Sequence, residues 1–283
     1  MGNVSIQWVR SDGRTFTADG SLWGLVAASG LDEPNVEVYT QKSAVGDGDL
    51  ITGRRVGSRT LEWTLKARQA ALNDTLRRAA TSFFSAAQTY DIYVFRSGAP
   101  RFAPGCALES FAVPTDSPYV PLTLKLSFLL PEGYFLSTEN FGQNIAAVEA
   151  RWGYPFASLE SIGRVYGVFA CAQTVLLVND GDAEAYCRAV FTARGDVTNP
   201  KLIAGDGYVR VLTTLQVGDS LEIDGRTKAV TINGENAAAL LDRGSRFDGI
   251  VFALGVNEVG FSADVGSNLL DVFVYYNKRY LGA

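Results

Sequence analysis

The segment VPLTLKLSF (Val120–Phe128) decides the fold class, because apolar and polar side chains alternate along it. Successive side chains of a β-strand point to opposite faces, so a period of two predicts one buried face and one face in solvent. Pro121 has no backbone N–H to donate, which predicts a sheet edge or the start of the strand at this end. The segment therefore predicts a half-buried strand of a β-sheet.

Further strands are expected through the first half of the chain. They lie at Val4–Trp8, Val36–Tyr39, Leu61–Leu65 and Asp91–Arg96. Asp12-Gly13 is a hairpin turn signal after the first of them. The first half is therefore predicted to be mainly β.

One helix is expected among these strands, at about residues 69–87. Its apolar side chains recur at helical spacing, which is typical of a helix lying on a sheet. The apolar stripe consists of Leu72, Leu76, Ala79, Ala80, Phe83, Phe84 and Ala87. We interpret this stripe as core packing and expect Arg77 and Arg78 on the opposite face, in water.

The second half predicts a β-sandwich, because short apolar runs are separated by closely spaced turn signals. The runs are Thr174–Val178, Ala185–Ala193, Tyr208–Leu212, Ser220–Ile223 and Ala229–Ile232. Asp224-Gly225 predicts a type I′ hairpin turn, and Asn233-Gly234 marks the next turn. The last strand is expected to place Leu270, Val272, Val274 and Tyr276 on one face.

Length and composition fit two folded domains. The chain has 283 residues, 47% of them apolar and 19% charged, and domains average about 150 residues. The segment from about 134 to 160 has no clear period and contains Gly142, Gly153 and Pro155. We place the boundary there, giving an N-terminal β domain at 1–140 and a C-terminal sandwich at 141–283.

The composition removes several classes of chemistry. The chain has no histidine, which is the commonest general base and metal ligand. Its three cysteines, Cys106, Cys171 and Cys187, lack the close spacing of a zinc site. We expect buried free thiols, with a Cys171–Cys187 bridge as the open alternative. No catalytic, metal or cofactor site is predicted, and we expect that the protein is not an enzyme.

Charge and hydropathy bear on the partners and the compartment. The net charge of −5 gives no basic field that would attract nucleic acid. The N-terminus has no basic region before an apolar core, as a signal peptide would. No run approaches the roughly 18 apolar residues of a membrane helix. We expect a protein that is made in a cytoplasm and does not insert into membranes.

Two local clusters are weighed as candidate sites. Asp47 and Asp49 resemble the start of a calcium loop, but Ser58 stands where such a loop needs glutamate, so we expect a solvated turn. The stretch from Gly46 has no Gly-Lys-Ser/Thr and is no phosphate loop. Arg54, Arg55 and Arg59 form the densest basic patch, expected to be a solvated strand end or a contact with carboxylates of a neighbouring subunit or another protein.

Taken together, these features resemble a known family, the distal tail proteins of siphophages that infect mainly Gram-positive hosts. Three passages carry the resemblance, and their order spans nearly the whole chain. They are GDGDLITGRRVGSRTLEWTLKAR (Gly46–Arg68), LSFLLPEGYF (Leu126–Phe135), and the second half with VNDGDAEAYCRAVFTARGDVTNPKLI (Val178–Ile203), VGDSLEIDGRTKAVTINGEN (Val217–Asn236) and FALGVNEVGFSADVGSNLLDVFVYY (Phe252–Tyr276). The chain departs from the family at Tyr186 and Cys187, where a proline often follows the turn.

The resemblance implies a structural protein at the virion tail tip, assembled in the host bacterial cytoplasm. Such proteins form a homohexameric ring that links the tail tube to the tail-tip hub and adsorption apparatus. Their second domain is galectin-like and faces outward. The implied partners are further copies of the chain, the tail tube protein, the hub protein and receptor-binding proteins, with DNA only passing through the lumen. An acidic protomer repeated around that lumen would repel DNA.

Two other functions stay open from the residues. A galectin-like sandwich can bind host cell-wall glycans, and Tyr275, Tyr276 and Tyr280 could stack on a sugar. However, the second half has one tryptophan, Trp152, and no histidine. For the tyrosines we favour core and interface roles. A glycoside hydrolase would need two opposed carboxylates, and nothing singles out such a pair among the 30 acidic residues.

Overall fold

A computed structural model gives the fold. It describes residues 4–43, 47–96, 99–114, 119–139, 141–150, 167–170 and 174–283, and the backbone alone at 141–150 and 167–170. The chain forms two compact units. Unit 1 contains residues 1–138 together with 279–283, and unit 2 contains residues 139–278. The division at 138 lies beside the predicted boundary at 140, whereas the last five residues, predicted in the second domain, belong to unit 1.

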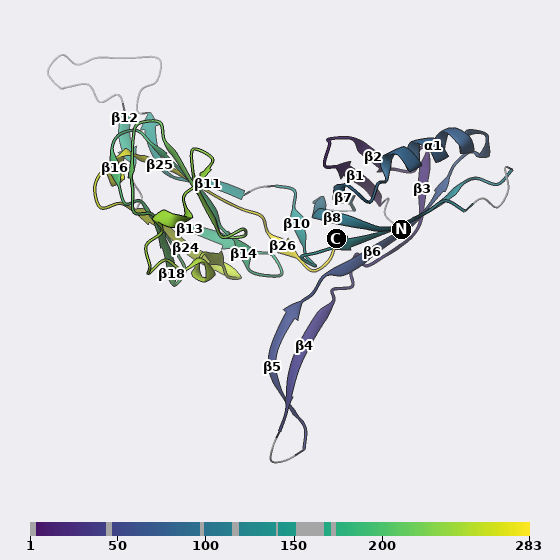
Figure 1. The fold of residues 1–283 in the computed structure, drawn as a ribbon, viewed down its shortest axis with the longest axis horizontal. Coiled ribbons are helices and arrows are strands. Elements are labelled where there is room, and N and C mark those ends of the chain that lie inside the picture. Colours follow the sequence, from purple (N-terminus) through teal and green to yellow (C-terminus); the bar gives the residue numbers. More distant parts are fainter. Residues whose placement is uncertain are drawn as a thin grey trace. The chain divides into compact units, whose positions relative to one another are not determined.

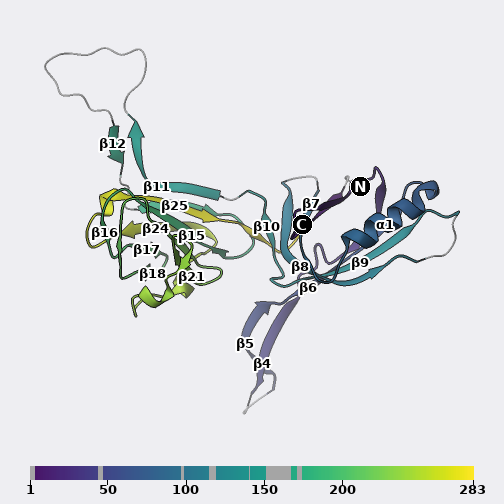
Figure 2. The same cartoon turned by 45° about the horizontal axis from the view of Figure 1, so that its top comes forward.

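Unit 1 is a nine-stranded antiparallel sheet with one helix and a separate hairpin (Figures 1 and 2). Its elements are β1 (Ser5–Arg10), β2 (Thr15–Ala18), β3 (Trp23–Ser29), β4 (Val36–Lys42), β5 (Asp49–Val56), β6 (Arg59–Ala67), η1 (Ala70–Leu72), α1 (Asn73–Phe83), β7 (Thr89–Phe95), β8 (Arg101–Ala112), β9 (Thr123–Leu130), β10 (Phe135–Ser137) and β26 (Arg279–Tyr280). The sheet order is β2-β1-β7-β8-β9-β6-β3, with β10 paired to β8 and β26.

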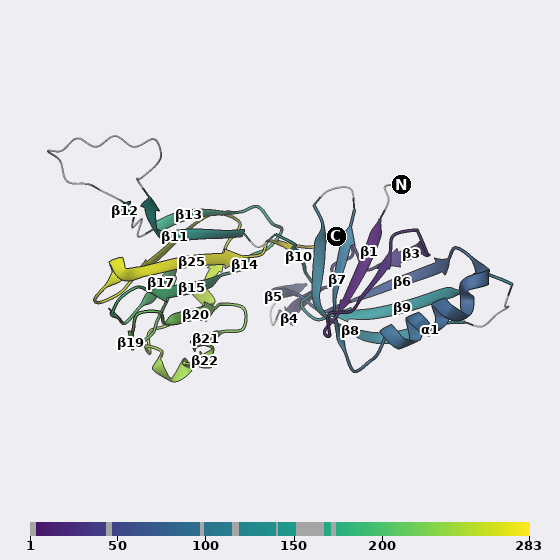
Figure 3. The same ribbon diagram turned by 90° about the horizontal axis from the view of Figure 1, so that it is seen from above.

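The central strands of unit 1 follow the predicted period of two. In β9, Leu122 precedes the strand, and Leu124, Leu126, Phe128 and Leu130 are buried in turn. Residues Thr60–Lys66 of β6 pair with Thr123–Leu129 of β9, and Figure 3 shows the two strands side by side. Val120 is exposed and lies outside the strand, so the regular segment begins after Pro121.

The helix is shorter than predicted. It spans Asn73–Phe83 after the short 3₁₀ turn at Ala70–Leu72, and Phe84 has an extended backbone. Leu76, Ala80 and Phe83 are buried against the sheet, as expected. Ala79 and Ala87 of the predicted stripe are exposed, because α1 ends before Ala87 and turns only its Leu76–Ala80–Phe83 face to the core.

Aromatic rings fill the centre of unit 1. Trp8 and Trp63 are fully buried and meet edge to face, with their ring centroids 5.4 Å apart. Phe84 contacts Trp8 from the end of α1 at 6.1 Å between centroids. Edge-to-face aromatic pairs add about 1 kcal/mol each beyond area burial, so this cluster fixes α1 against the sheet.

Unit 2 is a β-sandwich. Its elements are β11 (Phe141–Ala150), β12 (Gly167–Ala170), β13 (Thr174–Asn179), β14 (Ala185–Tyr186), β15 (Arg188–Ala193), β16 (Val197–Thr198), β17 (Lys201–Ala204), β18 (Gly207–Arg210), β19 (Thr214–Leu215), β20 (Ser220–Asp224), β21 (Ala229–Ile232), β22 (Glu235–Asn236), η2 (Ala238–Leu240), η3 (Phe247–Gly249), β23 (Val251–Phe252), β24 (Gly255–Ser262), η4 (Ser267–Leu269) and β25 (Leu270–Tyr276). A seven-stranded sheet, β12-β11-β25-β15-β20-β21-β22, faces a four-stranded sheet, β13-β24-β17-β18, across one apolar core.

Two turns of unit 2 differ in the way their backbones close. Asn233 and Gly234 both have positive φ, 51° and 83°, and they join Ile232 to its partner Glu235 as a two-residue turn. The hairpin after Asp224 instead has a longer loop that closes at the Asp224–Ala229 pair, with positive φ at Lys228 and not at Gly225. The predicted type I′ turn at Asp224-Gly225 is therefore wrong, and Asn233-Gly234 has that geometry.

Candidate assembly surfaces

The hairpin β4–β5 exposes several apolar side chains of unit 1. Its strands pair with each other and, among the described residues, with no other strand. Figure 1 shows the hairpin extending away from the sheet of unit 1. Exposed apolar side chains line it: Val36, Val38, Tyr39, Leu50 and Ile51. Several exposed apolar side chains on one protruding element make it a candidate interaction site.

The predicted basic patch is not one patch. Arg54 is exposed on β5. Arg55 forms an ion pair with Glu37 across the hairpin, with 2.7 Å between Nε and Oε2, and this pair lowers the pKa of the Glu37 carboxyl. Arg59 is buried in β6, only 4% exposed, and donates from Nη1 to the carbonyl of Gly30. The expectation of a solvated end is therefore wrong for Arg59.

The acidic loop at Asp47 and Asp49 forms no metal site within the described residues. Asp47 and Asp49 are both exposed, and Asp49 begins β5 opposite Lys42. Gly46 lies outside the described residues. No cluster of three or more potential metal ligands occurs in the described parts of the chain.

The three tyrosines weighed as a sugar platform lie apart. Tyr276 is buried, and its hydroxyl donates to the Val178 carbonyl at 2.9 Å. Tyr275 is on the opposite face of β25, stacked on Phe273 with 5.7 Å between ring centroids. Tyr280 belongs to unit 1. Trp152 lies outside the described residues.

Two cysteines are buried free thiols, Cys106 and Cys187. Burial raises the pKa of both thiols well above the ordinary range, which keeps them protonated and unreactive. Since Cys187 is free, the alternative of a Cys171–Cys187 bridge is wrong; Cys171 itself lies outside the described residues.

No helix in the described residues is long and apolar enough to cross a membrane.

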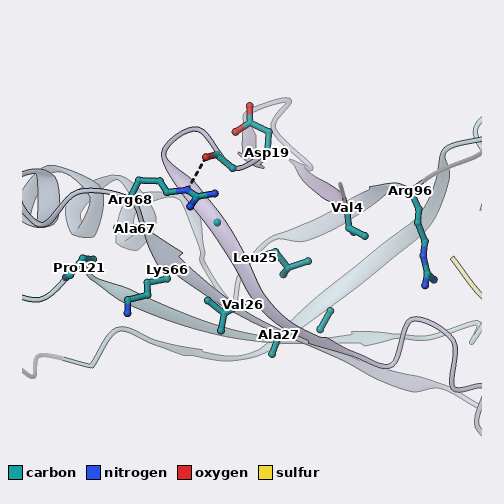
Figure 4. A pocket seen from close by; sticks show the side chains of 13 residues that line it. Val4, Asp19, Leu25, Val26, Ala27, Lys66, Ala67, Arg68, Arg96 and Pro121 are labelled. Atoms are coloured by element: carbon teal, nitrogen blue, oxygen red, sulfur yellow. Dashed lines mark hydrogen bonds between the residues drawn. The ribbon is translucent and has the colours of Figure 1, made fainter. Parts of the chain in front are cut away.

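A groove in unit 1 runs along β3, with a volume of about 720 Å³. Its lining is Val4, Asp19, Gly20, Gly24, Leu25, Val26, Ala27, Ala28, Lys66, Ala67, Arg68, Arg96 and Pro121. Figure 4 shows the Arg68 guanidinium at one end, bonded to the Gly20 carbonyl. The sequence did not predict this groove, because its walls come from segments far apart in the chain.

Part of the chain matches a known protein family. A family model described as "Siphovirus-type tail component, C-terminal domain" matches residues 180–280. Those residues cover most of unit 2, so unit 2 is similar to the C-terminal domain of siphovirus-type tail components. The resemblance to siphophage distal tail proteins that the sequence predicts is thereby confirmed, together with the mainly β fold.

Solved structures share the fold along the whole chain. The crystal structure of the SPP1 Dit (gp 19.1) protein, "a Paradigm of Hub Adsorption Apparatus in Gram-positive Infecting Phages", aligns at a TM-score of 0.65 and 14% identity, covering 98% of this chain and 99% of that one. A chain of the phage P2 baseplate in its activated conformation with Ca aligns at 0.56 and 12%, covering 100% of both chains. The phage p2 baseplate with Sr gives 0.53 and 11%, covering 96% and 97%. A comparison with curated sequences gives no match.

Proposed function

We propose that the chain is the distal tail protein of a long non-contractile phage tail, and that it acts by geometry and not by catalysis. Its copies form a hexameric ring that links the tail tube to the tail-tip hub and adsorption apparatus. The partners are further copies of the chain, the tube protein, the hub protein and receptor-binding proteins. The virion tail tip is its final location, after assembly in the host cytoplasm.

The proposal of a ring rests on the exposed apolar residues of the hairpin β4–β5. Leu50 is 66% exposed and Ile51 is 51% exposed, so both would lose water contact on binding another surface. A protruding element that docks on a different surface of the next copy makes a head-to-tail contact, and such contacts generate rings when the rotation closes.

Single-particle mass measurement and negative-stain images of the purified full chain test the ring. The chain is expected to form closed hexamers, and the double variant Leu50→Glu, Ile51→Glu is expected to leave monomers. Val217→Glu is the matched control, since Val217 is 71% exposed in unit 2, and it should leave the ring intact. Only monomers at high concentration, also with tail partners present, would overturn the proposal.

The charge of the protomer supports free passage of DNA. The chain carries −5 overall, and of the three arginines in its densest basic patch, Arg55 is ion-paired and Arg59 is buried. A ring of such protomers would repel DNA and let it slide. An image of the ring with Arg54 and Arg55 lining the lumen would contradict this part of the proposal.

Carbohydrate binding by unit 2 is the second candidate function. Tyr275 and Phe273 stack on the outer face of β25, and the ion pair Arg188–Glu222, 2.6 Å between Nε and Oε1, lies beside Tyr275 in the register. Aromatic faces with flanking polar groups can bind sugars. Saturable binding of the full chain on a glycan array, lost in Tyr275→Ala and kept in Tyr119→Ala, would favour this candidate over the ring alone.

A further inference from the structure

The strand β3 has a free edge. It pairs with β6 and ends the sheet order, so no described strand lies on its other side. Proteins usually protect such an edge with lysine, proline or charged side chains. The sequence of β3, WGLVAAS, has none of these. A β-bulge also protects an edge, and β3 has one at Val26, between Leu25 and Ala27, with regular pairing to β6 on both sides of it.

The groove beside this edge has an apolar floor. Val4 and Leu25 line it and also pack partly against the core of unit 1. Val26 is 62% exposed, and Ala27 and Ala28 continue the same surface. Small apolar side chains along the unpaired edge of a strand leave the backbone N–H and C=O groups of that edge accessible to another strand.

The rim of the groove is cationic in a chain that is acidic overall. Lys66 and Arg68 are exposed on it, and neither has a carboxylate partner among the described residues. Arg96 also lines the groove, and its Nη1 forms an ion pair with Oδ2 of Asp32 at 2.7 Å. Asp19 is the one acidic residue of the lining, and its carboxylate already accepts bonds from the backbone and hydroxyl of Ser21.

The guanidinium of Arg68 lies beside Gly24 of β3. A Cβ on Gly24 would lie 3.4 Å from Arg68 Cζ, an ordinary contact distance, so the guanidinium lies directly against the strand at this residue. Arg68 Nε donates to the Gly20 carbonyl at 3.0 Å, as Figure 4 shows. A guanidinium has five N–H donors, and this bond uses one of them, so the others can meet an incoming carboxylate.

We propose that this groove binds an extended acidic segment of a partner protein, which adds to β3 as a further strand. The free uncharged edge supplies backbone hydrogen bonds, and the Lys66–Arg68 rim selects carboxylates. Nucleic acid fits less well, because no aromatic side chain lines the groove to stack on bases. The proposal goes beyond the ring and does not depend on it.

The probe is a synthetic peptide in which valine and glutamate alternate, titrated into the full chain by fluorescence anisotropy. We expect saturable binding that weakens at high salt, and slower amide hydrogen exchange along β3 in the complex. Lys66→Glu should weaken binding by about fivefold or more, since it replaces attraction by repulsion. Lys125→Glu on β9 is the matched control: this residue is exposed on the same sheet and outside the groove lining, and the change should leave the affinity unchanged.

Other results would overturn the proposal. These are no binding, equal losses in Lys66→Glu and Lys125→Glu, or equal binding of the corresponding valine–lysine peptide. Binding without slower exchange in β3, or equal binding of single-stranded DNA, would mean simple anion attraction. If Lys66→Glu alters the mass of the assembly without peptide, the groove belongs to a contact between copies of this chain. Hexamer formation is measured separately, so failure here and failure of the ring are distinguishable.

Discussion

The guanidinium of Arg59 lies over the ring of Phe135, with Cζ 4.8 Å from the ring centroid. Arg59 is 4% exposed, and it donates from Nη1 to the Gly30 carbonyl at 3.3 Å. Its Nε and Nη2 have no hydrogen-bond acceptor in the part of the chain that the structure describes. Burial lowers the pKa of the guanidinium, while the charge of Asp32 opposes that shift. The cation thus joins β6 to β10 at a cost in desolvation.

The effect of replacing Arg59 on the stability of unit 1 should therefore depend on how much side-chain volume the replacement keeps. Arg59→Ala is expected to lower the free energy of unfolding of unit 1 by about 2–4 kcal/mol, because contacts with Phe135 and Gly30 are lost. Arg59→Met should stay within about 1 kcal/mol, since an apolar chain avoids the desolvation cost. Urea titration followed by tryptophan fluorescence measures this, because Trp8, Trp23 and Trp63 are buried in unit 1. The exposed Arg54→Ala is the control, and equal losses in both Arg59 variants would contradict the argument.

Gly30 should tolerate no side chain. Its φ is +78°, and a Cβ would lie 2.1 Å from the backbone oxygen of Thr60. Gly30→Ala is expected to destabilise unit 1 by more than about 3 kcal/mol, since backbone must move. Gly13 is the matched control: its φ is +85° with nothing within 4 Å, so Gly13→Ala should cost only about 1–2 kcal/mol. Similar losses in the two variants on urea titration would show that φ alone matters.

Asp12 should make the stability of unit 1 pH-dependent. Its carboxylate accepts hydrogen bonds from Arg10 first, and also from the backbone and side chain of Arg14, and these lower its pKa well below the usual range. The folded pKa lies below the unfolded value of about 3.9. The added stability is thus fully present above that value and is lost as the pH falls through the folded pKa. Asp12→Asn should unfold at lower urea than the native chain at neutral pH, with the gap narrowing below about pH 4. Asp49→Asn should show no such gap, and a pH-independent gap for Asp12→Asn would contradict the assignment.

The period of two along the strands predicted which residues are buried better than residue type did. β6 and β9 pair along their lengths with alternate residues buried, as the alternation predicts. The same period places Arg59 two residues before Leu61, and Arg10 two residues after Trp8. Both arginines are buried, at 4% and 6% exposure. We expected Arg59 in water from its residue type, although its position in the period indicated the buried face.

Other features could not be predicted from local pattern. Val36 and Val38 alternate with polar neighbours, yet both are exposed in β4, because the hairpin has no described sheet against which to bury them. The groove along β3 depends on which strands end the sheet order. Pairing of strands far apart in the chain sets that order, and a period of two carries no information about it.

The last residues of the chain should stabilise unit 1, although the sequence assigned them to the second domain. Tyr280 pairs with Phe135 in the sheet of unit 1, and Arg101 lies over the Tyr280 ring, 3.7 Å from its centroid. Arg101 Nη1 also donates to the Gly282 carbonyl at 2.6 Å, and the Ala283 N–H donates to Leu31. A chain ending at Lys278 should therefore lose about 2–4 kcal/mol of unit 1 stability, with faster amide exchange in β8 and β10 and unchanged exchange in β15. Arg101→Ala should give a smaller loss of the same kind, and the exposed Arg78→Ala on α1 should give none. Unchanged exchange in β10 after truncation would mean that β26 only rests on a sheet that is stable without it.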